Sequence, residues 1–390
     1  MRVAYVVGAY PAPSETFIER EVEALAARGV EVEVFPLWPC EEESARRGRV
    51  HRCPGFSLAA ELSRPGACLR WDWYFARRVF REGKAALWAS WRLGQAFQMA
   101  RRMRELSVQR VHAHFANGPS TLGWVAASVA GVPFSFSVHA RDVFVEPQFF
   151  RAKARAADRI VACNSAVAKR AAELVDESAR SKIALVPHGL PLARYAFRSE
   201  PSSGEPMVLG VGRLVEKKGF IHLVRAVARL RQRGRAVSCW LIGDGPEREP
   251  LQREIAQLRL ADAVELKGWL SQDEVVAAYG RAFVLAVPSL VARDGDMDGL
   301  PNVVVEAAAM GVPIVATNVG GIGDLVRDGD TGLVALPGDP EDLAGRIEKV
   351  LADPEGAAAR ALRARQEVEA RFDQEKCIPA LLDALGISRS

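Results

Sequence analysis

Short apolar segments alternate with longer amphipathic ones along most of this 390-residue sequence, and this alternation restricts the possible folds most strongly. Apolar segments that alternate with helices are typical of parallel βαβ units. A helix is expected at 15–28, closed by Gly29. In the first half the expected strands are residues 3–7, 30–36, 110–114, 133–139, 159–163 and 184–187. The pattern therefore predicts an α/β fold with a doubly wound sheet.

The pattern begins again in the second half of the chain. Residues 199–206 are rich in Ser, Pro, Gly and Glu, as in a linker. A helix at 219–233 follows, with further strands at 207–211, 237–243, 264–267, 283–288 and 313–316. Because the chain is also too long for one ordinary core, we predict two Rossmann-like domains that face a cleft, residues 1–195 and 205–370.

Ligands of doubly wound sheets bind beyond the carboxyl ends of the strands. Six loops of this chain follow expected strands and are therefore the places to look for a site. They are Gly8–Thr16, His114–Pro119, His139–Val143, Gly212–Gly219, Gly243–Pro246 and Leu290–Asn302.

Residues 40–110 interrupt the alternation and read as a helical insert. They hold 15 basic and 7 acidic side chains, with several tryptophans among the arginines. One interpretation is that residues 70–104 make a peripheral contact with an anionic membrane or an acidic acceptor. The other is that the aromatic side chains pack the insert onto its own domain. No nucleic-acid partner is expected.

Hydrophobic runs and cysteine spacing indicate where in the cell the protein works. No apolar run approaches the roughly 20 residues of a membrane span, and no signal region precedes the first strand, so we expect a cytoplasmic protein that at most touches the inner membrane face. The six cysteines form no C-x-x-C pair, which gives no indication of a zinc knuckle or redox pair. Cys163 and Cys239 lie in apolar runs and are expected to be core residues.

The segment from Ser289 to Val326 carries the strongest functional pattern. An apolar run ends at Pro288, a loop rich in Gly and Asp follows, and a helix is expected to begin near Pro301. Amides at such a helix start bind phosphate, and an acid one turn further in, Glu306, can accept hydrogen bonds from a ribose diol.

This segment resembles family 4 of the retaining glycosyltransferases, which have the GT-B fold and a Glu-x7-Glu signature. Here the signature is Asp-x7-Glu, formed by Asp298 and Glu306. The resemblance, closest to bacterial exopolysaccharide enzymes of the colanic-acid type, implies that Asp298 lies near the hydroxyls of the transferred sugar and that Glu306 binds the ribose. Gly299, Leu300 and Asn302 would complete this loop.

A second segment, Gly210 to Gly219, resembles the loop with which the family binds the donor diphosphate. The resemblance assigns the diphosphate to Gly212, Arg213 and Lys218, with Lys217 one place off. Two cations there would neutralise the charge of a departing nucleoside diphosphate, so no metal or other cofactor is expected. Gly243 with Asp244, and Gly268 with Trp269, are similar to further landmarks, the second beside the nucleobase.

The first half resembles the family more loosely. His139 corresponds to the active-site histidine, and the first loop, with Ser14, Glu15 and Thr16, to the region that meets the acceptor. His114 and Asn117 are weaker candidates for the acceptor. The final helix near 373–385, within residues 371–390, would cross back to the first domain, as in this fold family.

The resemblance implies transfer of a hexose-type sugar from a UDP- or GDP-sugar to a hydroxyl of a glycan, glycolipid or small molecule, with retention of configuration. A nucleotide-sugar epimerase, a sugar phosphorylase and a non-catalytic nucleotide-sugar-binding protein remain alternatives. The acids at 294, 296 and 298 resemble the start of an EF-hand, but Val305 occupies the position of its final acid, so calcium binding is rejected.

Overall fold

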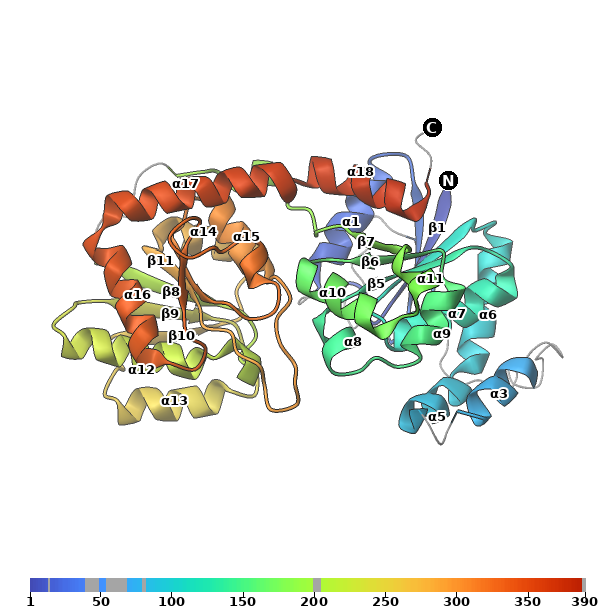
Figure 1. Cartoon of the computed structure of the whole chain (residues 1–390), viewed down its shortest axis with the longest axis horizontal. Helices are drawn as coiled ribbons and strands as arrows, with labels where there is room; N and C mark the ends of the chain where they lie inside the picture. The colour runs from blue at the N-terminus through green and yellow to red at the C-terminus, as the bar shows by residue number, and fades with distance from the viewer. Residues whose placement is uncertain (13–14, 39–48, 54–68, 79–81, 199–204, 388–390) are drawn as a thin grey trace. The chain divides into compact units, whose positions relative to one another are not determined.

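The computed structural model describes residues 1–12, 15–38, 49–53, 69–78, 82–198 and 205–387. It divides the chain into two compact units (Figure 1). Unit 1 comprises Met1–His188 and Cys377–Ser390, and unit 2 comprises Gly189–Lys376. Ser14 and most of the expected linker at 199–206 lie outside the described residues.

Unit 1 is built on a seven-stranded sheet in which every pairing is parallel, in the order β3-β2-β1-β4-β5-β6-β7. The order reverses between β1 and β4, which defines the switch point of the sheet. The strands are β1 Arg2–Val7, β2 Glu31–Pro36, β3 Arg49–Val50, β4 Arg110–His114, β5 Phe134–Val138, β6 Arg159–Ala162 and β7 Ile183–Leu185.

The alternation of side chains along β1 explains why both faces of this sheet are covered. Val3, Tyr5 and Val7 point into one hydrophobic core, and Ala4 and Val6 point into another. Helices α1 and α18 close the first core, and Figure 1 shows them together, with α6 and α7 on the other side of the strands. The helices are α1 Thr16–Ala26, α3 Leu69–Ala76, α5 Lys84–Trp91, α6 Leu93–Glu105, α7 Gly118–Ala130, α8 Ala140–Phe144, α9 Phe150–Ala156, α10 Ser165–Leu174, α11 Glu177–Arg180 and α18 Gln374–Leu385.

The segment 40–110 is less of an insert than its sequence indicates. Its two-residue strand β3 pairs with β2, and α6 packs against the sheet through buried residues such as Met99 and Met103. Only α3 and α5, among the described residues, are additions to the alternating pattern. Trp71 and Phe75 pack this addition onto unit 1, as one interpretation of the aromatic side chains expected, whereas Trp73 and Trp91 are 63% and 58% exposed.

Unit 2 contains a six-stranded parallel sheet in the order β10-β9-β8-β11-β12-β13. This is the Rossmann order 3-2-1-4-5-6, and its switch point lies between β8 and β11. The strands are β8 Met207–Val211, β9 Ser238–Ile242, β10 Val264–Gly268, β11 Val284–Val287, β12 Ile314–Thr317 and β13 Leu333–Ala335.

Two hydrophobic cores cover the faces of this second sheet. Helices α12, α13 and α16 contribute to one of them, and α14, α15 and α17 contribute to the other. The helices are α12 Phe220–Gln232, α13 Arg248–Gln257, α14 Gln272–Arg281, α15 Asn302–Ala309, α16 Pro340–Ala352 and α17 Pro354–Arg371, with short 3-10 turns η2 Leu192–Arg194, η3 Glu216–Lys218 and η4 Ile322–Asp324. The prediction of two doubly wound α/β domains is confirmed. Among the described residues, no helix combines the length and apolar character that crossing a bilayer requires.

Candidate active site

The loops at the carboxyl ends of β8, β9, β10 and β11 are joined by backbone hydrogen bonds. The amide of Leu214 donates to the carbonyl of Asp244 at 2.9 Å, and that of Gly243 donates to Gly268 at 2.8 Å. The amide of Leu290 donates to Lys217 at 2.9 Å. These bonds gather the loops that the sequence assigned to the donor at the switch point of unit 2.

Gly243 shows how closely these loops approach one another. Its φ is 134°, and a Cβ atom there would collide with the carbonyl oxygen of Gly212. Only glycine combines this backbone conformation with so close a contact. The glycines of this region therefore bring backbone amides of neighbouring loops together.

Two lysines from the β8 loop meet two aspartates from the β11 loop. Lys218 Nζ donates to Asp298 Oδ2 at 2.9 Å, and Lys217 Nζ lies 3.1 Å from Asp296. Ser289, directly after β11, donates its hydroxyl to the same Asp298 oxygen at 2.6 Å. The sequence predicted Lys218 and Asp298 as site residues, and the structure joins them directly.

Asp298 is nearly buried yet stays ionised. Burial alone would raise the pKa of its carboxyl group. The charges of Lys218 and Lys217, together with the Ser289 hydrogen bond, outweigh burial and hold that pKa below its ordinary value. The carboxylate can therefore accept hydrogen bonds at neutral pH while it fixes the position of the Lys218 ammonium group.

Arg213 differs from the two lysines because its side chain is exposed. Within the described part of the chain it makes no salt bridge. It follows Gly212 at the end of β8, and so it presents a guanidinium group beside the loop amides. A planar guanidinium binds phosphate oxygens in bidentate fashion.

Glu306 lies on the first turns of α15 and is only 4% exposed. The hydroxyl of Tyr279, a completely buried residue of α14, donates to Glu306 Oε2 at 3.0 Å. Burial and the neighbouring Glu306 charge raise the pKa of Tyr279 well above its ordinary value, so the tyrosine remains a donor. The Tyr279 hydroxyl of α14 thus fixes one oxygen of the Glu306 carboxylate.

The remaining residues assigned to the donor follow β9, β10 and β11 of the same sheet. Asn302 is the first residue of α15, Leu300 packs at the edge of the core, and the carbonyl of Gly299 accepts the amide of Gly321 at 3.1 Å. Asp244 accepts the amide of Gly245 through its side chain at 2.7 Å. Trp269, directly after β10, is 55% exposed.

In unit 1 the switch point holds a buried polar group. Tyr5 on β1 donates its hydroxyl to Glu21 of α1 at 2.5 Å, and His114 Nε2 of β4 lies 3.3 Å from the same oxygen. The ring nitrogens of His112 lie 3.0 Å and 2.9 Å from the hydroxyls of Ser135 and Ser137. The sequence assigned His114 to the acceptor, but its ring is completely buried and has no exposed surface for one.

These buried groups have strongly shifted pKa values. Burial lowers the pKa of His112 to about 3, aided by His114. For Glu21 burial opposes ionisation, but His114, His112 and the Tyr5 hydroxyl outweigh it and lower the pKa to about 2. The group therefore contains neutral His112 beside a carboxylate at neutral pH.

His139 follows β5 and caps the short helix α8. Its backbone amide donates to Asp142 Oδ2 at 2.8 Å, which fixes its position at the end of the strand. Its ring contacts Phe115 and Phe17, with centroids 4.4 Å and 5.3 Å away. Burial, and then His188 and His114, lower the pKa of His139 well below its ordinary value, so its ring is neutral.

The other residues assigned to the acceptor lie around the same end of the sheet. Glu15 caps α1 and Thr16 begins it. Asn117 caps α7, and its carbonyl accepts the hydroxyl of Thr121 at 2.8 Å. Ser14 lies outside the described residues.

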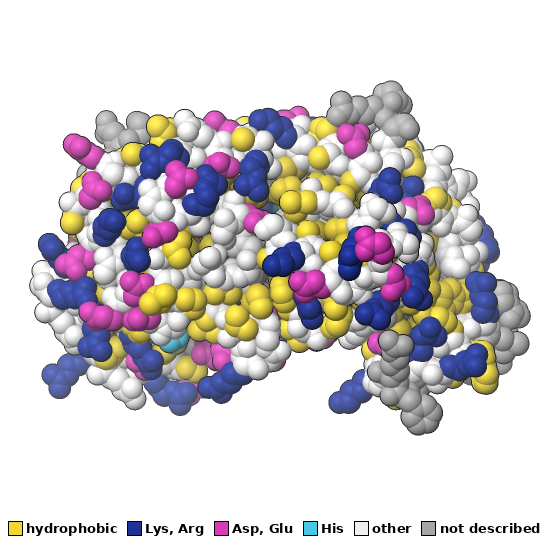
Figure 2. All heavy atoms as spheres, in the orientation of Figure 1, with side chains coloured by type: hydrophobic (Ala, Val, Ile, Leu, Met, Phe, Trp, Pro, Cys, Tyr) yellow, Lys and Arg dark blue, Asp and Glu magenta, His cyan; other side chains and the backbone are white. Residues whose placement is uncertain are grey.

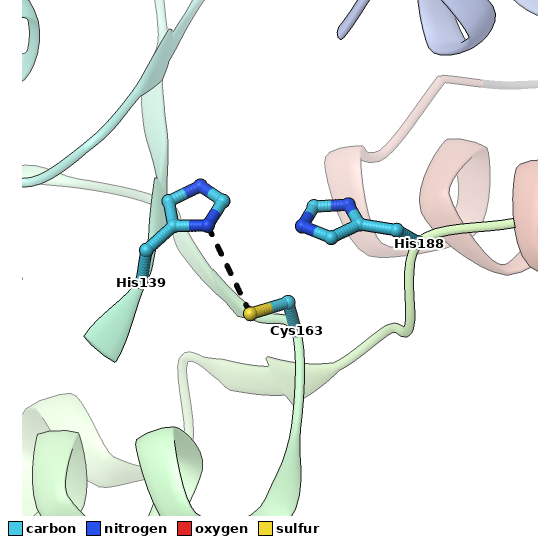
Figure 3. Close-up of side chains that lie close together, drawn as sticks. All are labelled: His139, Cys163 and His188. Atoms are coloured by element: carbon cyan, nitrogen blue, oxygen red, sulfur yellow. Dashed lines mark hydrogen bonds between the residues drawn. The ribbon is translucent and has the colours of Figure 1, made fainter. Parts of the chain in front are cut away.

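Two residues beside His139 were not predicted as site residues. Cys163, after β6, and His188, after β7, turn toward His139 (Figure 3). The expectation that Cys163 is a core residue is wrong, because it is partly exposed at the strand end, whereas Cys239 is completely buried as expected. The signal was their position at the ends of two expected strands: Cys163 is the last residue of 159–163, and His188 directly follows 184–187.

Each half of the chain matches a known protein family. Residues 14–194 match the family described as Glycosyltransferase Family 4, and residues 194–367 match Glycosyl transferases group 1. A protein of Escherichia coli (strain K12) named for colanic acid biosynthesis, the glycosyltransferase WcaL, is 27% identical over 99% of this chain and 100% of its own length. The 2-deoxystreptamine glucosyltransferase of Streptomyces kanamyceticus is 31% identical over 63% of this chain and 68% of its own length.

The solved structures agree at the level of the fold. Anabaena HepE, in complex with UDP and glucose, superposes with a TM-score of 0.74 over 99% of both chains at 18% identity. The expected GT-B fold is therefore confirmed. The matches over both halves of the sequence show that this chain is a glycosyltransferase that belongs to the family 4 and group 1 enzymes.

Proposed function

We propose that this enzyme transfers a hexose-type sugar from a UDP- or GDP-sugar to a hydroxyl group of a glycan, glycolipid or small molecule, with retention of configuration. One observation carries the proposal: Lys217 and Lys218 pair with the buried Asp298 at the switch point of unit 2, where the same β8 loop carries the exposed Arg213 and the following helix α15 carries the buried Glu306. Cations suit a diphosphate, and buried carboxylates suit sugar hydroxyls. The names of WcaL and of the amylovoran enzyme AmsK of Erwinia amylovora support a role in polysaccharide biosynthesis.

The parts of the donor would contact different elements of unit 2. Arg213 and Lys218 bind the diphosphate, together with amides of the Gly212 loop and of the start of α15. Glu306 accepts hydrogen bonds from the ribose, and Trp269 lies against the base. Asp298 turns one oxygen to the sugar hydroxyls while the Ser289 hydrogen bond keeps the other in place.

The acceptor would bind to unit 1, where His139, Glu15, Thr16 and Asn117 lie around the end of the sheet. Neutral His139 can donate or accept one hydrogen bond with a sugar hydroxyl, and its lowered pKa keeps it from acting as a general acid at neutral pH.

We assign the transfer to attack on the face from which the diphosphate leaves. The acceptor oxygen forms a bond to the anomeric carbon as the bond from that carbon to the phosphate oxygen breaks. The bonding electron pair leaves with the nucleoside diphosphate, and a phosphate oxygen takes the acceptor proton. Asp298 is a poor covalent nucleophile because Lys218 and Ser289 both engage it.

The charge on the leaving diphosphate would be neutralised by side chains. Each cation near a developing negative charge contributes several kcal/mol, roughly 3 for one donor removed from a comparable site. With Arg213, Lys217 and Lys218 on one loop, we propose that transfer needs no metal ion. Transfer that proceeds unchanged in excess EDTA supports this assignment, and loss of transfer that added Mg²⁺ or Mn²⁺ restores contradicts it.

A panel of UDP-, GDP- and ADP-sugars tests the donor assignment. The correct donor should raise the unfolding temperature of the parent protein, and the shift should vanish in Glu306→Ala. NMR of the product should show the anomeric configuration of the donor sugar. An inverted product contradicts retention, and an isomerised free nucleotide sugar favours an epimerase.

We further propose that α3 and α5 contact an anionic membrane at its cytoplasmic face. Trp73, Leu87 and Trp91 are each more than half exposed, and Arg77 and Arg92 lie over the two indole rings at 5.1 Å and 5.6 Å. Figure 2 shows Lys and Arg side chains beside hydrophobic ones over the corner where Figure 1 places these helices. Exposed tryptophans ringed by arginines match the interface of an anionic bilayer.

Vesicle sedimentation tests this contact. The parent protein should bind vesicles that contain phosphatidylglycerol and not neutral ones, and salt should weaken the binding. The double variant Trp73→Ser, Trp91→Ser should lose it, whereas Trp269→Ser, which removes an equally exposed tryptophan from unit 2, should not. Equal binding to both kinds of vesicle contradicts the proposal.

A further inference from the structure

Three side chains with metal-binding atoms converge in unit 1 (Figure 3). Cys163 Sγ lies 3.9 Å from His139 Nδ1, and the ring of His188 is nearly parallel to that of His139, with centroids 5.3 Å apart. One ligand atom from each of the three residues lies within 4.8 Å of the others. In Figure 3 the nitrogen-bearing edge of His188 faces the same space as the sulfur and His139 Nδ1.

The fold holds these residues in place. They follow β5, β6 and β7, three adjacent parallel strands, so their positions are set by the register of the sheet. The amide of His139 is fixed by Asp142, and the residue after Cys163, Asn164, caps α10 by accepting the amide of Val167 at 3.0 Å. The cluster is therefore preorganised in the way that a ligand set requires.

The two rings have unused hydrogen-bonding capacity. Among the described residues, the buried Nε2 atoms of His139 and His188 have no hydrogen-bond partner. A buried ring nitrogen without a partner is uncommon and requires an explanation. A neutral imidazole can offer the lone pair of one ring nitrogen to a metal ion.

A second group of buried acids and histidines is less suited to an ion. Its members are Glu21, His112 and His114. Both ring nitrogens of His112 already lie within 3.0 Å of serine hydroxyls, and all three ligand atoms are enclosed. The cluster of His139, Cys163 and His188 is the better candidate because each of its residues is partly exposed and an ion can reach it.

We propose that His139, Cys163 and His188 form a binding site for Zn²⁺. Two imidazoles and one thiolate suit zinc, whose tetrahedral sites accept this mixture and leave a fourth position to water. Zn–N bonds of about 2.1 Å and Zn–S bonds of about 2.3 Å place tetrahedral ligand atoms roughly 3.5 Å from one another. The three ligand atoms lie within 4.8 Å of one another, so they would move together by at most about 1.3 Å. The Cys163 thiol releases its proton to solvent as the bond to the ion forms.

Binding of the ion would inhibit transfer, and this consequence rests on the proposed role of His139. A ring that ligates zinc through Nδ1 carries its proton on Nε2, so it can no longer accept a hydrogen bond from the sugar or the acceptor and is held in place by the ion. The cluster would thus make the enzyme sensitive to zinc although its own reaction uses no metal. Removal of the ion by a chelator frees the His139 ring and restores transfer.

Cobalt titration tests the site without reference to activity. Reduced full-length protein should take up one Co²⁺ and develop the visible bands of a tetrahedral site, together with a thiolate-to-cobalt band in the near ultraviolet, and Zn²⁺ should displace it. Cys163→Ser should lose the near-ultraviolet band and bind at least tenfold more weakly. The matched control Cys53→Ser removes a thiol from the same unit and should behave as the parent protein does. No tetrahedral bands in the parent, or an unchanged spectrum in Cys163→Ser, overturns the site.

Activity measurements then test the consequence. Zn²⁺ should inhibit transfer by the parent and by Cys53→Ser, EDTA should reverse the inhibition, and Cys163→Ser should remain active at the same Zn²⁺ concentration. If cobalt binds through Cys163 but zinc leaves transfer unchanged, the metal site stands and the role of His139 in transfer is overturned.

Discussion

Substituting Lys218 by Met removes one charge and keeps most of the side-chain volume. In the parent protein the Lys218 ammonium group lies 2.9 Å from Asp298, whose side chain is 7% exposed. Without it the carboxylate keeps, among the described side chains, the Ser289 hydroxyl and Lys217, whose ammonium group is 3.9 Å away. Loss of one partner of a buried pair costs about 3–5 kcal/mol, and we expect about 2 kcal/mol here because Lys217 remains.

The catalytic cost of Lys218→Met is separate from this structural cost. Removing one group that stabilises a developing negative charge lowers kcat by about 10²–10³. The stability loss should lower the melting temperature by roughly 4–8 °C, since about 1 kcal/mol corresponds to 2–4 °C in a domain of this size. Thermal unfolding and the initial rate of nucleoside diphosphate release measure the two effects independently.

A double variant distinguishes the two effects. Asp298→Asn added to Lys218→Met removes the unpaired buried charge, so the melting temperature should recover while transfer stays low. Lys217→Met is the matched control, since it removes an equally buried lysine from the same loop and should reduce the rate by less than about tenfold. Near-parental turnover in Lys218→Met would refute the assignment of this lysine to the diphosphate.

Three further predictions concern single contacts. Tyr279→Phe removes the hydrogen bond to Glu306, worth about 1.5 kcal/mol or more to a charged acceptor, so isothermal titration should show about tenfold weaker donor binding with an unchanged fold. His112 has a folded-state pKa of about 3 and an unfolded value of about 6.5, so the folded protein binds fewer protons and loses stability as the pH falls from 6.5 toward 3. Urea unfolding at pH 7 and pH 5 should show about 2 kcal/mol less pH dependence in His112→Asn than in the parent protein. Gly243→Ala places a Cβ atom against the carbonyl of Gly212, and both the melting temperature and donor affinity should fall, whereas Gly234→Ala, also at a positive φ but with open space around it, should affect stability alone.

The sequence predicts the sheets well because their strands are buried on both faces. The expected strands at 110–114 and 207–211 coincide with β4 and β8. β8 is a continuous apolar run, as is typical of a buried parallel strand, whereas β4 alternates Val111 and Ala113 with His112 and His114. β3 and β13 were missed because they have two and three residues, too few for a pattern. Pairing with a neighbouring strand, which a local pattern does not contain, makes them part of the sheets.

Site residues that belong to a sequence motif could be predicted, but the contacts between them could not. Lys218 and Asp298 are 80 positions apart and were assigned to two different parts of the donor, yet their direct ion pair depends on the neighbouring positions of β8 and β11. Tyr279 and Ser289 escaped notice because a tyrosine in a helix and a serine after a strand are unremarkable until their partners are known. The convergence of His139, Cys163 and His188 likewise follows from the strand order and not from any local spacing.

Acceptor-dependent release of nucleoside diphosphate tests the central claim most directly. The purified enzyme is incubated with the donor that stabilises it most, with and without a polysaccharide repeat-unit acceptor, and nucleoside diphosphate and glycosylated product are measured together. We predict that both appear in equal amounts and only when the acceptor is present. Tight donor binding without release in the presence of any acceptor, or release that is independent of the acceptor, would contradict the assignment of this site to glycosyl transfer.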